Sequence, residues 1–257
     1  MEYLTVSNIK LEVKRYQGND TAPTLIFLHE GLGCVDMWRD FPERLSQSTG
    51  CPALIYSRQG YGRSDSCPLP RSLNYMHDEA LEILPQVITA ENIKDYILIG
   101  HSDGGSIAVI HAGGEHRKKL RAIITMAPHV FCEEISVQSI RQARQDFLTG
   151  KLRLNLQKHH HDNTDCAFWG WNDIWLNPDF IHWNIEAYLP NITVPQLILQ
   201  GNDDHYGTVA QVHAMTQKSA GPVTVHMLPN CGHAPYREQT PQSIRLIEDF
   251  LRPFAAI

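Results

Sequence analysis

The chain has 257 residues, of which 42% are hydrophobic and 19% charged, with a formal net charge of −6 at pH 7. A chain of this length buries roughly 70–75% of the surface exposed by its unfolded form, so it can fold around its own core. The mild acidity disfavours nucleic acid as a partner, and no apolar run approaches the ~20 residues of a membrane-spanning helix.

Seven short apolar segments are predicted as strands: Leu11–Tyr16, Thr24–His29, Ala53–Ser57, Tyr96–Gly100, Ala122–Met126, Gln196–Gln200 and Val223–Leu228. Several of them are apolar throughout, which is typical of strands buried on both faces of a sheet. Helices are predicted between them, at Met37–Leu45, Tyr75–Val87, Gly104–Gly113, Val209–Ser219 and Ser243–Phe254. This alternation favours an α/β fold, with a mostly parallel central sheet flanked by helices.

The alternation stops between Val130 and Pro195, where only helical patterns occur, such as Ile135–Leu148 and Pro178–Tyr188. Four of the five tryptophans fall in this region: Trp169, Trp171, Trp175 and Trp183. Ligand pockets are typically apolar and lined by aromatic side chains. We therefore interpret residues 130–195 as a helical lid over a core domain of residues 1–129 and 196–257, although some of its aromatic residues must form the lid's own core.

The strongest local signal is the segment Gly100-His101-Ser102-Asp103-Gly104, which matches the pattern G-x-S-x-G. In this pattern a sharp turn from strand to helix holds the serine in a strained backbone conformation, and side chains at the glycine positions would collide with neighbouring segments. An apolar strand precedes the segment and a helical pattern follows it, as the turn requires. Ser102 is therefore predicted as a nucleophile rather than only as the N-cap of the following helix.

A serine hydroxyl needs a base to take its proton and a carboxylate to orient that base. Asp204 follows the strand Gln196–Gln200, and His233 follows the strand Val223–Leu228. Since the carboxyl ends of parallel strands meet at one edge of a sheet, both are expected near Ser102. The chain order Ser102, Asp204, His233 is also the order typical of this elbow. The alternatives are Asp203 for the acid and His205 or His226 for the base.

Further motifs accompany the elbow in order along the chain: Leu28-His29-Glu30-Gly31-Leu32-Gly33, Ser57-Arg58-Gln59-Gly60-Tyr61-Gly62-Arg63-Ser64, Gly201 with Asp204, and Cys231-Gly232-His233. With them, nearly the whole chain resembles the α/β-hydrolase fold family. The segment Gly-His-Ser-Asp-Gly-Gly is similar to that of uncharacterised bacterial serine hydrolases in this family. The resemblance implies an α/β-hydrolase fold with a helical lid inserted after the sixth strand.

The same resemblance implies an oxyanion hole built from the backbone N–H groups of Gly31 and Asp103. Leu32 is the alternative to Gly31, because Glu30 stands where the family has a glycine. A carboxylate beside this hole opposes the negative charge that develops there. Either Glu30 or Asp103 therefore faces the substrate and anchors a cation or hydroxyl, or both turn away into salt bridges or solvent.

These residues predict a serine hydrolase that cleaves a carboxylic ester of a small to medium, apolar or ring-bearing substrate through an acyl-enzyme, without a cofactor. Hydrolysis of a lactone, thioester or C–C bond, cofactor-free oxygenation, and a hydrolase-fold receptor with little turnover are the alternatives, since fold alone does not decide among them. The predicted pocket residues are Glu30, His129, Trp169, Trp171, Trp175, His205 and Tyr206. The sequence does not predict the oligomeric state.

The run His159-His160-His161 suggests a metal site, but consecutive side chains of a regular helix point about 100° apart and do not converge on one ion. No metal is therefore predicted. The six cysteines have no C-x-x-C spacing and are expected to be reduced thiols. The segment Met1-Glu2-Tyr3-Leu4 lacks the basic-then-apolar order of a signal peptide, so the expected location is cytoplasmic.

Overall fold

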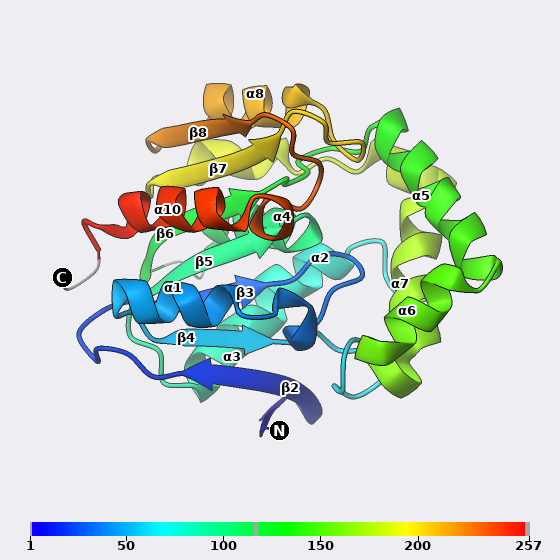
Figure 1. Cartoon of the computed structure of the whole chain (residues 1–257), viewed down its shortest axis with the longest axis horizontal. Coiled ribbons are helices and arrows are strands. Elements are labelled where there is room, and N and C mark those ends of the chain that lie inside the picture. The colour runs from blue at the N-terminus through cyan, green and yellow to red at the C-terminus, as the bar shows by residue number, and fades with distance from the viewer. Residues whose placement is uncertain (1, 116–117, 255–257) are drawn as a thin grey trace.

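The computed structural model describes residues 2–115 and 118–254. Eight strands form one sheet in the order β1-β2-β4-β3-β5-β6-β7-β8 (Figure 1). Their bounds are β1 Glu2–Val6, β2 Ile9–Tyr16, β3 Thr24–Leu28, β4 Ala53–Tyr56, β5 Tyr96–His101, β6 Leu120–Met126, β7 Gln196–Gly201 and β8 Val223–Leu228. The pairs β1–β2 and β2–β4 are antiparallel and the other five are parallel, so the predicted mostly parallel sheet is confirmed.

Helices cover both faces of the sheet. Helices α1 and α10 lie on one face, and α3, α4 and α8 lie on the other (Figure 1). The helices are α1 Phe41–Thr49, α2 Tyr75–Asp78, α3 Leu84–Ala90, α4 Asp103–Gly113, α5 Glu134–Leu148, α6 Lys151–His160, α7 Thr164–Trp175, α8 Val209–Lys218, α9 Pro235–Glu238 and α10 Thr240–Leu251. A turn of π-helix, Glu79–Ile83, joins α2 to α3.

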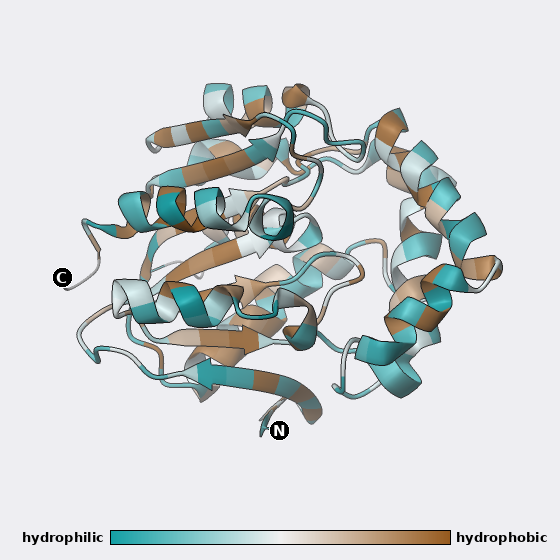
Figure 2. Ribbon diagram, viewed as in Figure 1, coloured by the Kyte–Doolittle hydropathy of each residue, from teal (hydrophilic) through white to brown (hydrophobic). Residues whose placement is uncertain are grey.

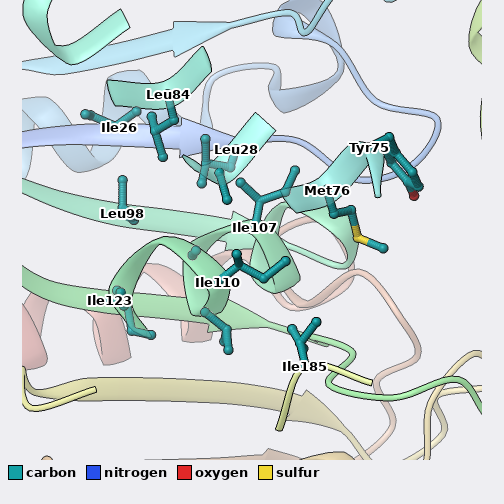
Figure 3. Packing of buried hydrophobic residues seen from close by; sticks show 14 of the residues in the cluster. Ile26, Leu28, Tyr75, Met76, Leu84, Leu98, Ile107, Ile110, Ile123 and Ile185 are labelled. Carbon is teal, nitrogen blue, oxygen red and sulfur yellow. The ribbon is translucent and has the colours of Figure 1, made fainter. Parts of the chain in front are cut away.

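Strand β3 shows why the central strands are apolar throughout. Its side chains alternate between two buried clusters, with Leu25 and Phe27 on the side of α1 and α10. Ile26 and Leu28 point to the other side and belong to the buried cluster that includes Ile107 of α4, which lies beside Leu28 (Figure 3). Figure 2 shows the resulting hydrophobic band through the middle of the sheet. Because both faces are covered, a polar residue at any of these positions would lose its solvation.

Several local predictions differ from the structure, and three of the differences have a clear local cause. Strand β1 was not predicted, because it is an edge strand with exposed positions that joins β2 through a tight turn at Ser7 and Asn8, both with positive φ. Helix α1 begins at Phe41 rather than Met37, since a short 3₁₀ turn with Arg39 at φ 55° precedes it. The predicted helix Pro178–Tyr188 is two 3₁₀ turns, because Asn184 between them pairs with Phe131.

The segment between β6 and β7 contains α5, α6 and α7, which lie beyond the carboxyl ends of the parallel strands (Figure 1). Within the described residues of this segment, strand-like pairing is limited to the Phe131–Asn184 bridge. No helix in the described part of the chain is long and apolar enough to cross a membrane. The division into a core domain and a lid at residues 130–195 stays a prediction.

Candidate active site

Ser102 lies at the sharp turn between β5 and α4, with φ 51° and ψ −117°, a conformation that L-residues rarely adopt. Its N–H donates to the Met126 carbonyl at 2.9 Å, which anchors the turn to β6. Gly104 allows the turn to form, because a Cβ there would overlap the backbone carbonyl of Leu28 on β3. The serine is 7% exposed and lines a cavity of about 300 Å³.

Asp204 and His233 meet at the same edge of the sheet, on the loops that follow β7 and β8. The Nδ1–H of His233 donates to both carboxylate oxygens of Asp204, at 2.8 and 2.9 Å. The carboxylate also accepts hydrogen bonds from the Tyr206 amide at 2.8 Å and the Gln200 side chain at 2.7 Å. Four well-placed interactions therefore hold Asp204 in one orientation.

The electrostatic setting keeps this pair as a carboxylate beside a neutral imidazole. Burial opposes ionisation of Asp204, but the hydrogen bonds with His233, Tyr206 and Gln200 outweigh it and lower the pKa of the carboxyl. Burial also lowers the pKa of His233, although the Asp204 carboxylate opposes that effect. With its proton on Nδ1, the His233 imidazole presents Nε2 as an unprotonated acceptor.

The residues considered as alternatives to Asp204 and His233 lie outside the Asp204–His233 pair. Asp203 is exposed, and its backbone N–H donates to the Cys231 carbonyl at 2.9 Å. His205 is exposed at the rim of the cavity, and its ring lies 4.7 Å from that of Tyr206. His226 lies on the edge strand β8 and is not among the cavity residues.

The loop after β3 brings Gly31 and Leu32 to the cavity wall. Within the described residues, neither of their N–H groups has a hydrogen-bond partner, and the N–H of Asp103 is in the first turn of α4, where no helical acceptor exists. Gly31 also packs directly against the Trp171 indole, so that a Cβ there would overlap the ring. The loop and the start of α4 therefore present unpaired donors beside Ser102.

The two carboxylates beside this region point in different directions. The Asp103 side chain is fully buried away from the cavity, accepts a hydrogen bond from the Tyr75 hydroxyl, and lies 4.0 Å from the Arg58 guanidinium. Burial raises the pKa of Asp103, against the effect of Arg58. For Asp103 the substrate-facing alternative is therefore wrong, because its carboxylate belongs to an internal network.

Glu30 lines the cavity, and its Oε2 lies 3.4 Å from Nδ1 of His101. Burial alone would raise the pKa of Glu30, but the adjacent His101 imidazole lowers it to about 2. The Nε2–H of His101 donates to the backbone carbonyl of His233 at 2.7 Å. Glu30 is therefore linked through His101 to the loop that carries His233.

Four of the seven predicted pocket residues line this cavity: Glu30, Trp171, His205 and Tyr206. The other three predicted residues do not line it. Trp169 turns toward α5 and packs on Phe147. Trp175 is buried, and its Nε1–H donates to the Tyr75 hydroxyl at 3.1 Å. His129 is buried behind the site, with its ring 5.7 Å from that of His233.

The short helix α9, which was not predicted, supplies Tyr236, Arg237 and Glu238 to the cavity. The Glu238 carboxylate accepts hydrogen bonds from the Gly232 amide at 2.7 Å and the Ala234 amide at 2.9 Å, so it holds both sides of His233. Pro235 directly after this loop is a helix-start signal that could have revealed it.

His159 and His160, the last two residues of α6, have different partners. His159 lies 2.7 Å from the Asp36 carboxylate. His160 is buried, donates from Nε2 to the Leu32 carbonyl at 2.8 Å and accepts from the Gly62 amide at 3.0 Å. No group of three or more His, Cys, Asp or Glu within residues 2–115 and 118–254 could hold a metal ion.

A larger hollow of about 620 Å³ lies elsewhere, at the amino-terminal ends of β3 and β4, and includes Arg15, Glu91 and Asp95. Ligand sites of parallel α/β sheets lie at the carboxyl ends of the strands. The smaller cavity also contains Ser102 and His233. It is therefore the candidate active site.

The model of the alpha/beta hydrolase family matches residues 25–243. The chain is 24% identical to epoxide hydrolase 3 of Xenopus tropicalis, over 91% of this chain and 73% of that protein. It is 23% identical to 2-succinyl-6-hydroxy-2,4-cyclohexadiene-1-carboxylate synthase of Salmonella paratyphi C, over 94% of this chain and 99% of that protein.

Among solved structures, an esterase from Exiguobacterium antarcticum superposes with a TM-score of 0.77 at 17% identity, over 97% of this chain and 98% of that one. This likeness shows the same fold. Together with the family match over most of the chain, it establishes the classification. The chain belongs to the alpha/beta hydrolase family.

Proposed function

We propose that this protein is a serine hydrolase that cleaves carboxylic esters through an acyl-enzyme. One observation carries the proposal: Ser102, strained at the turn, shares a cavity of about 300 Å³ with His233, which is hydrogen-bonded to Asp204. A nucleophile, a base and an orienting carboxylate are the three groups that this chemistry needs.

In the proposed reaction His233 Nε2 takes the proton of the Ser102 hydroxyl while Oγ attacks the ester carbonyl. Asp204 keeps the other imidazole proton on Nδ1 and stabilises the imidazolium that forms. The N–H groups of Asp103 and of Gly31, or Leu32 in its place, stabilise the oxyanion. His233 then protonates the leaving alkoxide, and a water activated by the same base releases the acid.

The cavity supports a small to medium substrate with an apolar or ring-bearing part. Its volume of about 300 Å³ is at the lower end of the range for small-molecule sites. The rings of Trp171, Tyr206 and Tyr236 supply apolar wall, while Glu30 and Arg237 are charged. Since α7 carries Trp171, we propose that residues 130–195 act as the lid over this site.

The test combines active-site labelling with turnover. A fluorophosphonate probe is expected to label the native protein and not Ser102→Ala. p-Nitrophenyl esters from acetate to decanoate are then expected to be hydrolysed, with kcat/KM falling once the acyl chain outgrows the cavity. Failure of the native protein to react with the probe would overturn the nucleophile assignment. Labelling without ester turnover would redirect the proposal to lactones, thioesters or C–C bonds.

A further inference from the structure

Two cysteines that are 99 residues apart in the sequence lie side by side outside the candidate active site. Cys67 is in the loop between β4 and α2, and Cys166 is in the first turn of α7. Their sulfur atoms are 3.0 Å apart, and the Cys67 amide lies 3.5 Å from the Cys166 sulfur. Both side chains are half-buried, so small reagents can reach them.

A buried positive charge lies against this pair. The Arg71 guanidinium and both sulfur atoms pack against Gly60, which has φ 84°. A Cβ at this position would collide with all three groups. Arg71 donates to the Gln59 carbonyl at 2.7 Å, but its buried Nε has no hydrogen-bond partner. No carboxylate of the described residues lies within ion-pair distance of this arginine, although thirteen acidic side chains in the described part of the chain have basic partners.

A thiolate at Cys166 would supply a negative charge beside Arg71. The hydrogen bond from the Cys67 thiol lowers the pKa of Cys166 to about 6, with Arg71 acting in the same direction and burial opposing both. The same hydrogen bond and burial raise the pKa of Cys67. Cys166 is therefore the nucleophilic partner and Cys67 the one that retains its proton.

We propose that Cys67 and Cys166 form a redox-active dithiol, which a peroxide converts into an intramolecular disulfide that ties α7 to the loop between β4 and α2. This inference does not depend on the proposed ester hydrolysis. The sulfur atoms need to approach each other by about 1 Å to reach bonding distance.

The reaction balances in two steps. The Cys166 thiolate attacks one peroxide oxygen, which breaks the O–O bond, releases the other oxygen as water after protonation, and leaves a sulfenic acid on Cys166. The Cys67 sulfur then attacks the Cys166 sulfur, and the sulfenic oxygen leaves as a second water. The two thiols lose two electrons in total, and the peroxide gains them.

The disulfide would act on the helix that forms the cavity wall. Trp171 lies on α7 five positions after Cys166, and Gly170 between them packs against Arg71. A covalent bond at Cys166 would therefore hold the N-terminal half of α7 against the core. It would also close a loop of about 100 residues in the unfolded chain, which stabilises the folded form relative to the reduced protein.

The direct test treats the reduced, full-length protein with hydrogen peroxide and maps peptides without reduction. We expect a cross-linked peptide pair containing Cys67 and Cys166, two hydrogens lighter than the separate thiols, which dithiothreitol reverses. In the Cys67→Ser variant we expect the sulfenic acid on Cys166 to accumulate and to react with dimedone. In the Cys166→Ser variant we expect peroxide to leave the Cys67 thiol unoxidised. Cys132→Ser is the matched control, because Cys132 is also half-buried but takes no part in the sulfur–sulfur contact of the described residues, and this variant should form the cross-link as the native protein does.

Two further measurements keep the proposal falsifiable if a serine variant does not fold. Iodoacetamide at pH 7 should alkylate Cys166 roughly tenfold or more faster than Cys132 in the native protein, and Arg71→Gln should reduce that preference. The oxidised native protein should unfold at a temperature at least about 4 °C higher than the reduced protein. Equal alkylation rates, or peroxide treatment that leaves the two thiols unlinked, would overturn the proposal.

Discussion

The change Asp204→Asn tests the assignment of the orienting carboxylate. In the native protein this carboxylate accepts all four of its hydrogen bonds, from His233 Nδ1, the Tyr206 amide and the Gln200 side chain. Asparagine has nearly the same shape but only one acceptor oxygen, so its NH₂ group must replace an acceptor at one of these contacts.

The loss of an acceptor determines the expected size of the effect. When the asparagine oxygen accepts from the Tyr206 amide, its NH₂ faces His233 and favours the tautomer with Nδ1 unprotonated. The proton then sits on Nε2, and His233 no longer accepts the Ser102 proton. In serine proteases the equivalent change reduces kcat by about 10⁴, which corresponds to about 5 kcal/mol of transition-state stabilisation. We expect a reduction of about 10³–10⁴ in kcat/KM here.

Steady-state hydrolysis of a p-nitrophenyl ester measures this effect, with circular dichroism to show that each variant is folded. Asp203→Asn is the matched control, because Asp203 is adjacent but exposed, and it should retain kcat/KM within about twofold of the native value. If Asp203→Asn is the damaged variant, or if Asp204→Asn keeps full activity at neutral pH, the reasoning from tautomer control is refuted.

The other predictions concern the cavity and its charges. Glu30→Gln should lower the free energy of unfolding at pH 7 by up to about 3 kcal/mol, because the native pKa is lowered from 4.5 to about 2. This contribution is present above pH 4.5 and is lost as the pH falls toward 2. The free energies of unfolding of the two proteins, measured by urea titration, should therefore converge in acid. A difference that stays constant with pH would contradict the prediction. Trp171→Ala should raise KM for a bulky ester about tenfold, whereas Trp169→Ala should leave KM unchanged because Trp169 packs on α5; equal effects would contradict the cavity assignment. Because burial lowers the pKa of His233, kcat/KM should fall in acid with a midpoint below 6.5, and a midpoint above 6.5 in a pH–rate profile would show that Asp204 dominates over burial.

Much of the fold could be predicted because it depends on local patterns. The strand Val223–Leu228 has the predicted bounds, and the predicted strand Thr24–His29 ends one residue earlier, at Leu28. The elbow at Ser102 is a steric requirement of adjacent residues, and Asp204 and His233 follow strands that must end at one edge of the sheet. Strand β1 lacked such a signal, because an edge strand need not be apolar.

The directions of individual side chains required the tertiary structure. Trp169 and Trp171 are two positions apart on α7, but one packs on α5 and the other lines the cavity, since the helix turns about 200° between them. Glu30 and Asp103 are both acidic residues beside the predicted oxyanion hole, and only the position of Arg58 and Tyr75 shows that Asp103 turns inward.

The sequence by itself therefore determined seven of the eight strands, the elbow and the order of the residues around it, because hydrophobic periodicity and backbone sterics act over a few neighbouring residues. Only the tertiary structure decided which carboxylate and which tryptophan face the cavity, and that Cys67 and Cys166 meet. The physical reason is that these contacts join distant segments, such as Cys67 with Cys166 and Gly31 with Trp171, and their geometry depends on how the helices pack against the sheet.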